Sequence, residues 1–346
     1  MVYDCAKLKE FCEKLMCDAG LSEKDSRDFS DSLLFAQMRG IGSHGLTRLK
    51  TYYSRAKTGL VDAKAVPTVE NDQPSLLLVD GQNGMGVASA VYAMDACIDR
   101  AEKTGACFAA VKGGNHFGCA AYFALRAAKK GMIGVAMANG PVAMAAIGGR
   151  DPVLGTNPLA IAIPAAGREP YVLDMATSVV ARGKVALAAK EGREIPPTWG
   201  IDAEGHPTTD PNAVKCVLPF GGAKGYGIAL AIEVLCSALS GAKNGQTMGS
   251  FYDFSGKHQD SGFFVGALNA KSLLPEGAFE LATAALFDSI KNSPKAEGCE
   301  EIFIPGEIEQ RNYEKAQAQG VKLSDAIVKE LQELSQTTGI AFDCEL

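Results

Sequence analysis

The sequence predicts an α/β protein with helical segments at both ends of the chain, and three observations support this. Apolar residues recur at helical spacing through roughly the first 61 residues. The middle of the chain contains short apolar runs separated by helical stretches, such as SLLLVD (75–80) and PLAIAIP (158–164). Two further helical stretches close the chain, at roughly 276–292 and 323–336.

The N-terminal segment is predicted to form three helices. The first ends near Gly20, the second begins after Ser22, which has Asp25 three residues on, and the third begins after Ser43. Residues 67–74, bounded by two prolines, then form a linker.

Beyond the linker, alternating strands and helices are expected as far as residue 174. The section 192–219 is rich in turn residues and is predicted to be mostly loop. A long apolar helix over 225–242 and a strand near 263–267 follow it. Two units result, a helical one from 1–72 together with about 276–346, and an α/β one from 73–275.

Charge and cysteine content exclude several classes of protein. The net charge of −6 without a basic run argues against a nucleic-acid or membrane-surface partner. The first twenty residues lack a continuous apolar stretch, so a secretory signal is not expected. Ten cysteines without a CxxC pair, and four histidines without HExxH spacing, predict free thiols, no metal site and a cytoplasmic location.

The segment 75–111 has the strand, glycine turn, helix and strand of a nucleotide-binding unit. Its glycines, Gly81, Gly84 and Gly86, give GxxGxG, whereas the Rossmann turn needs GxGxxG. We therefore interpret it as a tight turn that leads into a packed helix.

Two histidines lie between glycines. If Ser43 caps the third helix, His44, Arg48 and Tyr52 follow at intervals of four and share one face. An arginine fork binds a carboxylate, and an imidazole exchanges a proton near neutral pH, so the row suits a small carboxylate that bears a hydroxyl or carbonyl. The alternative is a solvated helix face.

His116 lies in GGNHFG, whose glycines allow close approach of a ligand, and the helix after Gly118 would offer free N–H groups to an anion. A turn histidine with local hydrogen bonds is the alternative.

Asp174 ends a strand and either faces a cleft or caps a helix, while Lys224 in GGAKGYG meets a phosphate or points to water. The remaining histidines, His206 and His258, are expected at the surface.

Seven sequence blocks together resemble the malate/L-lactate dehydrogenase family of the second type, which is unrelated to the Rossmann lactate dehydrogenases. The blocks are RGIGSHGLTRLKTY, GGNHFGCAAYF, GGRDPVLGTNPLAIAIP, LDMATS with ARGKV, GHPTTDP, LPFGGAKGYG and IPGE. The resemblance covers nearly the whole chain. It implies a non-Rossmann NAD(P)-binding fold with a mixed, largely antiparallel sheet, in which 73–275 binds the cofactor and the helical unit serves substrate binding and dimer formation.

The resemblance also implies roles for individual residues. His116 and His44 match proton-transfer positions, and Arg48 matches a substrate-carboxylate clamp, with Tyr52 and Ser43 beside it. The positions that match cofactor contacts are Asn139, Gly140, Asp174, Met175, Ala176, Lys224, Gly225, Gly306 and Glu307. Ala146 and Ile147 depart from the Pro-Trp that many members carry, so the substrate cannot be copied from any one relative.

The expected activity is hydride transfer between nicotinamide and C2 of a small 2-hydroxy or 2-oxo acid, in a homodimer. NAD is the expected cofactor, and NADP remains open because the directions of Arg182 and Lys184 are unknown. Reduction of cyclic imino acids is an alternative that needs the same hydride geometry. A catalytically inactive, carboxylate-binding homologue is the alternative from another class.

Overall fold

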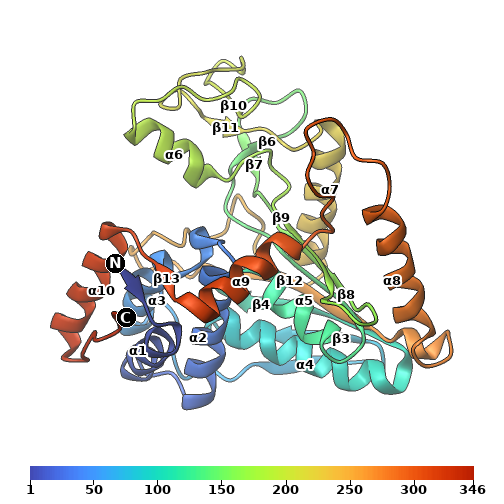
Figure 1. The fold of residues 1–346 in the computed structure, drawn as a ribbon. Coiled ribbons are helices and arrows are strands. Elements are labelled where there is room, and N and C mark those ends of the chain that lie inside the picture. The colour runs from blue at the N-terminus through green and yellow to red at the C-terminus, as the bar shows by residue number, and fades with distance from the viewer.

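The computed structural model describes residues 1–346 and centres on a seven-stranded sheet. Its strand order is β2-β3-β4-β12-β5-β8-β9 (Figure 1). The strands are β2 (Thr68–Asp72), β3 (Leu76–Asp80), β4 (Ala106–Gly114), β12 (Ser261–Leu268), β5 (Ile133–Ala138), β8 (Leu159–Ile163) and β9 (Tyr171–Met175). Within this sheet only β3 and β4 pair in parallel. The expected mixed, largely antiparallel sheet is confirmed.

Helices cover both faces of the sheet. Helices α4 (Gly86–Thr104) and α5 (Ala120–Ala128) pack on one face, where Phe263 of β12 stacks on Phe117. Gly262 precedes Phe263 in β12, and neighbouring residues of a strand point to opposite faces. A Cβ on Gly262 would overlap the carbonyl oxygen of Cys236, which lies in the π-helical turn (Val234–Ala238) after α7 (Ala223–Glu233). The segment formed by α7 and this turn therefore packs on the other face.

A helical layer stands at the end of the sheet where both termini lie (Figure 1). It contains α1 (Cys5–Asp18), α2 (Glu23–Met38), α3 (Leu49–Lys57), α9 (Glu307–Gln319) and α10 (Asp325–Thr338). The short strands β1 (Val2–Tyr3) and β13 (Val321–Lys322) pair and join the two ends of the chain. A single core of 58 buried residues includes side chains of this layer and of the sheet.

The structure confirms one predicted helix start, corrects another and adds a helix that was not predicted. Ser22 caps α2 as expected, because its hydroxyl accepts the Asp25 N–H at 3.1 Å. The third helix begins at Leu49 rather than after Ser43, since two short 3₁₀ turns, Gly42–His44 and Leu46–Arg48, precede it. Helix α9 was not predicted: its sequence, EIEQRNYEKAQAQ, has only one buried residue and so lacks a clear apolar face.

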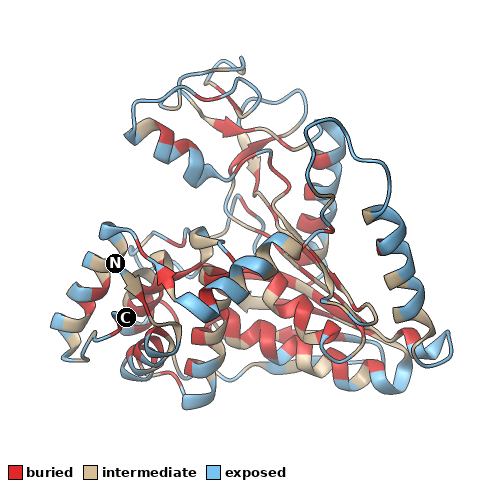
Figure 2. Cartoon of the chain, in the orientation of Figure 1, coloured by how far each residue is buried: buried red, intermediate tan, exposed pale blue.

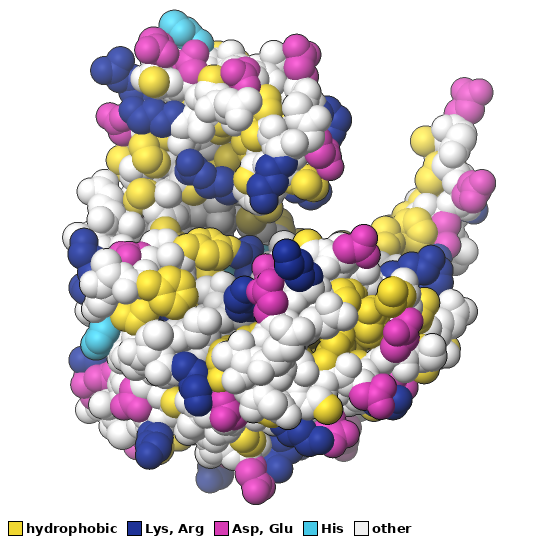
Figure 3. Space-filling view, turned by 90° about the vertical axis from the view of Figure 1, so that its left-hand side faces the viewer, with side chains coloured by type: hydrophobic (Ala, Val, Ile, Leu, Met, Phe, Trp, Pro, Cys, Tyr) yellow, Lys and Arg dark blue, Asp and Glu magenta, His cyan; other side chains and the backbone are white.

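The section expected to be mostly loop belongs to a small lobe above the sheet (Figure 1). A four-stranded sheet in the order β10-β11-β6-β7 and one helix build it. Its elements are β6 (Met144–Ala145), β7 (Pro152–Leu154), α6 (Arg182–Lys190), β10 (Gly200–Ile201) and β11 (Cys216–Val217). The lobe has a separate core of nine buried residues, and Figure 3 shows the surface hollowed between lobe and body.

Helix α8 (Ala278–Lys291) stands away from the helical layer and is largely exposed along its length (Figure 2). Phe287 is its one buried residue, whereas Leu281 and Leu286 are 64% and 58% exposed. All ten cysteines are free thiols, as predicted. None of the helices has the length and apolar character needed to span a bilayer.

Candidate active site

Most of the predicted site residues lie on loops at one edge of the central sheet. The carboxyl ends of β3, β4, β5 and β9 meet there with the amino ends of β8 and β12, as the pairings of Leu159 with Met175 and of Ser261 with Gly114 show. His116 follows β4, Asn139 follows β5, and Asp174 lies near the end of β9. The sheet topology therefore gathers segments that are far apart in the sequence.

The two histidines stack face to face. The ring centroids of His44 and His116 are 5.7 Å apart, with 13° between the planes. The Tyr52 hydroxyl hydrogen-bonds His116 Nδ1, and the Ser43 hydroxyl lies 3.0 Å from His44 Nδ1. Because Tyr52 occupies Nδ1 of His116, the Nε2 atom is the nitrogen left for a substrate.

The predicted row of His44, Arg48 and Tyr52 on one helix is corrected in its geometry. His44 and Arg48 lie in the two 3₁₀ turns, and only Tyr52 lies in α3. The three nevertheless come together: Arg48 Nε donates to the Ser43 carbonyl at 2.7 Å, which folds its guanidinium back over the turn. No carboxylate of the chain pairs with Arg48, so its terminal nitrogens are free for a ligand.

Burial keeps both imidazoles neutral at pH 7. Desolvation, followed by the charges of His44 and Arg48, holds the pKa of His116 well below its usual 6.5. Desolvation and Arg48 lower the pKa of His44 to about 4. Burial raises the pKa of the Tyr52 phenol, so its O–H stays protonated beside His116. A neutral imidazole can accept a proton, so both His44 and His116 are in the right state for this role.

The glycine turn that resembles a dinucleotide motif supports the His116 loop. A Cβ on Gly86 would lie 1.9 Å from the Asn115 carbonyl oxygen and 2.6 Å from that of His116. The Asn115 side chain donates to the carbonyls of Asn83 and Gly84 at 3.1 and 2.9 Å. The interpretation of a tight turn that leads into a packed helix is thus confirmed, and the packed partner is the histidine loop.

Substituting Gly86 by Ala should therefore displace His116. We expect the free energy of unfolding to fall by about 1–3 kcal/mol, as for an overpacked core site, and kcat to fall by about 10²-fold if the loop moves by ~1 Å. Denaturant unfolding and steady-state kinetics measure the two effects. Gly183→Ala, on an exposed helical turn with no atom within 4 Å of the added Cβ, is the control. Unchanged kcat in Gly86→Ala would contradict this role.

Asn139 belongs to a buried polar network rather than pointing into the cleft. Its amide nitrogen donates to Glu233 Oε1 at 3.1 Å and to the Lys243 carbonyl at 2.9 Å, and its Oδ1 accepts the Gly262 N–H. Glu233 also accepts from Asn157 Nδ2 at 2.8 Å and from the Gly245 N–H at 2.9 Å. This network fixes the backbone at Asn139 and Gly140.

Asp174 caps helix α5. Its Oδ2 accepts the Ala121 N–H at 2.9 Å and contacts Cys119 Sγ at 3.1 Å. The Ala121 N–H at the start of α5 is therefore not free for an anion, which corrects the expectation of free donors after Gly118. Burial raises the pKa of Asp174, although its hydrogen bonds act in the opposite direction. Met175 and Ala176 follow, both half-buried, at the edge of the sheet.

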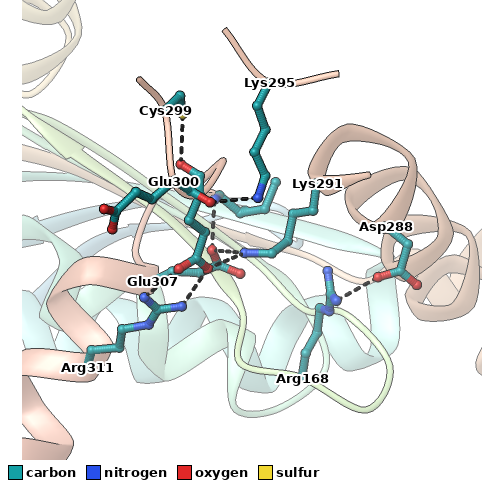
Figure 4. Close-up of polar contacts among 10 residues, drawn as sticks. Arg168, Asp288, Lys291, Lys295, Cys299, Glu300, Glu307 and Arg311 are labelled. Carbon is teal, nitrogen blue, oxygen red and sulfur yellow. Dashed lines mark hydrogen bonds and ion pairs between the residues drawn. The ribbon is translucent and has the colours of Figure 1, made fainter. Parts of the chain in front are cut away.

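Gly306 and Glu307 start helix α9 beside β9. Gly306 has φ 98°, and a Cβ there would lie 2.8 Å from Val172 Cβ, so glycine is required. The Glu307 carboxylate accepts from Lys291 Nζ at 2.5 Å and from the Ile304 N–H at 3.0 Å (Figure 4). Burial opposes ionisation, but these hydrogen bonds hold the pKa of Glu307 below its usual value. Its side chain therefore stabilises the α8–α9 connection.

Lys224 and Gly225 lie in the first turn of α7, which has features of an anion site. Gly222 precedes this helix at φ 63° and no side chain caps it. Lys224 is exposed and has no partner in the chain, while a Cβ on Gly225 would overlap the Phe220 carbonyl. The Gly225 N–H donates to the Phe220 carbonyl at 3.0 Å, which leaves the N–H groups of Ala223 and Lys224; these and the Lys224 ammonium fit the pyrophosphate of a dinucleotide. The Phe220 N–H bonds the Thr177 carbonyl at 3.0 Å, so this turn adjoins the end of β9.

Sequence reasoning missed several residues around His116. Gln259 is buried, and its Oε1 accepts the His116 N–H at 2.9 Å. Phe251 packs on His116 with centroids 4.8 Å apart, and Tyr252 lies over Arg48. They occur in a polar, glycine-bearing stretch without periodicity, so no sequence pattern indicated them. His206 and His258 are exposed as expected, and no group of three or more potential metal ligands occurs.

Comparison with known proteins places this geometry in a family. Residues 3–332 match the family described as malate/L-lactate dehydrogenase. L-Sulfolactate dehydrogenase of Methanocaldococcus jannaschii is 36% identical over 95% of this chain and 96% of its own. Ureidoglycolate dehydrogenase (NAD(+)) of Escherichia coli K12 is 31% identical over 94% and 93%.

Solved structures agree over nearly the full length. Sulfolactate dehydrogenase from M. jannaschii superposes with a TM-score of 0.93 at 35% identity, covering 98% of both chains. The Δ1-piperideine-2-carboxylate reductase from Pseudomonas syringae gives 0.87 at 28% identity, covering 96% of this chain and 99% of the other. The chain therefore belongs to the malate/L-lactate dehydrogenase family and is a nicotinamide-dependent oxidoreductase of small hydroxy acids.

Proposed function

We propose that this protein transfers a hydride between nicotinamide and C2 of a small 2-hydroxy or 2-oxo acid, with His116 as the proton-transfer residue. The observation that carries the proposal is the stacked pair of neutral histidines beside an arginine that has no carboxylate partner. The arginine is the group that a free substrate carboxylate would satisfy.

Each residue has a distinct task in this proposal. Arg48 binds the substrate carboxylate through its free terminal nitrogens, with Ser43 and Tyr52 lining the same side. A bound nicotinamide would supply the hydride acceptor for C2. In the oxidative direction, Nε2 of His116 takes the hydroxyl proton. Tyr52 holds the ring throughout: for Nε2 to take a proton the neutral ring carries its hydrogen on Nδ1, and the Tyr52 oxygen accepts from that N–H before and after the transfer. His44, which is also neutral at pH 7, completes the polar face.

The cofactor would be held by loops on both sides of the cleft. Lys224 and Gly225 at the start of α7 suit the pyrophosphate, and the Asn139–Gly140 turn, fixed by Glu233, suits the nicotinamide end. Asp174, Met175 and Ala176, with Gly306 and Glu307 beside them, would border the adenosine half. We favour NAD. NADP stays in the assay, because Arg182 and Lys184 are exposed on the lobe.

Reduction of a cyclic imino acid is the second candidate. The structural similarity to Δ1-piperideine-2-carboxylate reductase favours it, and the same clamp and proton donor would serve C=N as well as C=O. An inactive carboxylate-binding homologue would keep nucleotide binding without turnover.

We also propose that the working unit is a homodimer. Helix α8 exposes Leu281, Leu286 and Ile290, while α7 exposes Leu230 and the π-helical turn after it exposes Val234. Such apolar surface is typical of subunit interfaces. Sedimentation of the purified protein measures the assembly state.

The ten free thiols support a reducing compartment such as the cytoplasm.

A substrate panel tests the function. Oxidation of NADH and NADPH should be followed with pyruvate, oxaloacetate, sulfopyruvate, diketogulonate and piperideine-2-carboxylate, and ureidoglycolate should be run with NAD in the reverse direction. We expect turnover of at least one 2-oxo or 2-hydroxy acid. Turnover of the imine alone would favour the reductase, and tight nucleotide binding without turnover would favour the inactive homologue.

A further inference from the structure

The loop formed by residues 249–256, here called the aromatic loop, covers the two polar groups of the site. Phe251 is buried, with its ring centroid 4.8 Å from that of His116 and 4.9 Å from that of Tyr52. Tyr252 is 60% exposed, and its ring centroid lies 5.4 Å from the guanidinium carbon of Arg48. One side chain thus borders the proton-transfer residue and the next borders the carboxylate clamp.

A buried arginine holds this loop from beneath. Nη1 of Arg55, on helix α3, donates to the carbonyls of Ser250, Phe251 and Asp253 at 3.4, 3.3 and 2.9 Å. Arg55 is fully buried and forms no ion pair, and its Nε and Nη2 atoms have no partner in the chain. A buried charge is costly unless it is compensated, and the carbonyls that compensate this one all belong to the aromatic loop.

The loop has no regular structure of its own to hold it in place. It contains no helix or strand, and the Asp253 carboxylate bonds only within the loop, to Ser255. Gly249 donates to the Gln259 carbonyl at 3.1 Å, which closes the base of the loop beside the residue that holds His116. Arg55 is therefore the tie between helix α3, which carries Tyr52, and the two aromatic rings.

We propose that Arg55 is a positioning residue, and that the Phe251–Tyr252 pair determines which substituent a substrate can carry beyond C2. A substrate bound between Arg48 and His116 meets these two rings on the sides that neither polar group occupies. The specificity role rests on the proposed function. The positioning role of Arg55 is independent of the proposed function, because its hydrogen bonds to the aromatic loop are a property of the free protein.

Kinetics with two keto acids tests the specificity role. In Tyr252→Ala we expect KM for pyruvate to rise ~2- to 5-fold through loss of the cation–π contact. The ratio of kcat/KM for 2-oxohexanoate to that for pyruvate should rise about 10-fold, since pocket contacts of a few methylenes discriminate at this level. Phe251→Leu should shift the ratio in the same direction. Tyr92→Ala, an exposed tyrosine on α4, is the matched control.

Hydrogen exchange tests the tie independently of turnover. Amides of residues 249–256 should exchange ~10-fold faster or more in Arg55→Lys, which loses the planar fork and keeps the charge. The Kd of NADH should stay within about 2-fold, which shows that the rest of the protein is intact. Unchanged loop exchange in Arg55→Lys would overturn the positioning role.

The two proposals fail in different ways. An unchanged ratio between the two keto acids in Tyr252→Ala and Phe251→Leu overturns the specificity role in an active enzyme. A wild-type protein that turns over no 2-oxo or 2-hydroxy acid refutes the proposed function and the specificity role together. Hydrogen exchange then still decides whether Arg55 holds the aromatic loop.

Discussion

Replacing His116 by Ala is expected to lower kcat by about 10²- to 10⁴-fold, the range of general acid–base catalysis. Tyr52 occupies Nδ1 of His116 and leaves Nε2 for the substrate, whereas the partner of His44 Nδ1 is the hydroxyl of the exposed neighbouring residue Ser43. Steady-state oxidation of the hydroxy acid found in the panel measures the loss. The Kd of NADH should not change.

His206→Ala is the matched control, because His206 is exposed in a turn of the lobe and should leave kcat unaltered. If His116→Ala retains kcat within a factor of a few while His44→Ala loses it, the two histidines have the opposite roles. Retention in both would refute imidazole proton transfer altogether.

The pH dependence of the wild type gives a second measurement for His116. Its pKa lies below 6.5, so the ring is neutral and ready to accept a proton at and above pH 7. The kcat/KM for oxidation should therefore be level there and fall only well below pH 6.5, as the pH approaches the lowered pKa of His116. The free energy of unfolding should also fall as the pH is lowered, because the unfolded chain binds more protons than the folded one. The stability present above pH 6.5 is lost as the pH falls toward about 4, the pKa of His44 in the folded protein.

Arg48→Lys is expected to lower kcat/KM by about 10- to 10²-fold, equivalent to a charge-assisted hydrogen bond of ~1.5–3 kcal/mol. Charge is retained, but a lysine cannot bond the Ser43 carbonyl through Nε and present two further N–H groups to a carboxylate at the same time. The loss should appear mainly as a higher KM for the acid, with the Kd of NADH unchanged.

Arg27→Lys is the control for this substitution, since Arg27 is an exposed arginine of α2 whose nearest carboxylate is that of Glu23. Normal kcat/KM in Arg48→Lys would mean that another group binds the carboxylate. A loss of equal size with an uncharged aldehyde in place of the acid would also contradict the clamp.

The sequence alone determined those features that depend on local pattern. Glycines around His44 and His116, a capping serine at residue 22 and the apolar runs of the strands are local, so helices, strands and candidate catalytic residues could be predicted from them. The wrong glycine spacing at residues 81–86 also correctly argued against a Rossmann turn. The glycine spacing gave no indication that Gly86 packs against the backbone carbonyls of Asn115 and His116.

The tertiary structure decided everything that depends on contacts distant in sequence. Tyr52 bonds His116 across 64 residues, Asp174 caps a helix that begins 54 residues earlier, and Arg55 reaches the carbonyls of residues 250, 251 and 253. The aromatic loop and helix α9 show no clear apolar periodicity, so their conformations depend on what they pack against. The chemistry of the site was therefore visible in the residue types, whereas its geometry was set by the order of the strands in the sheet.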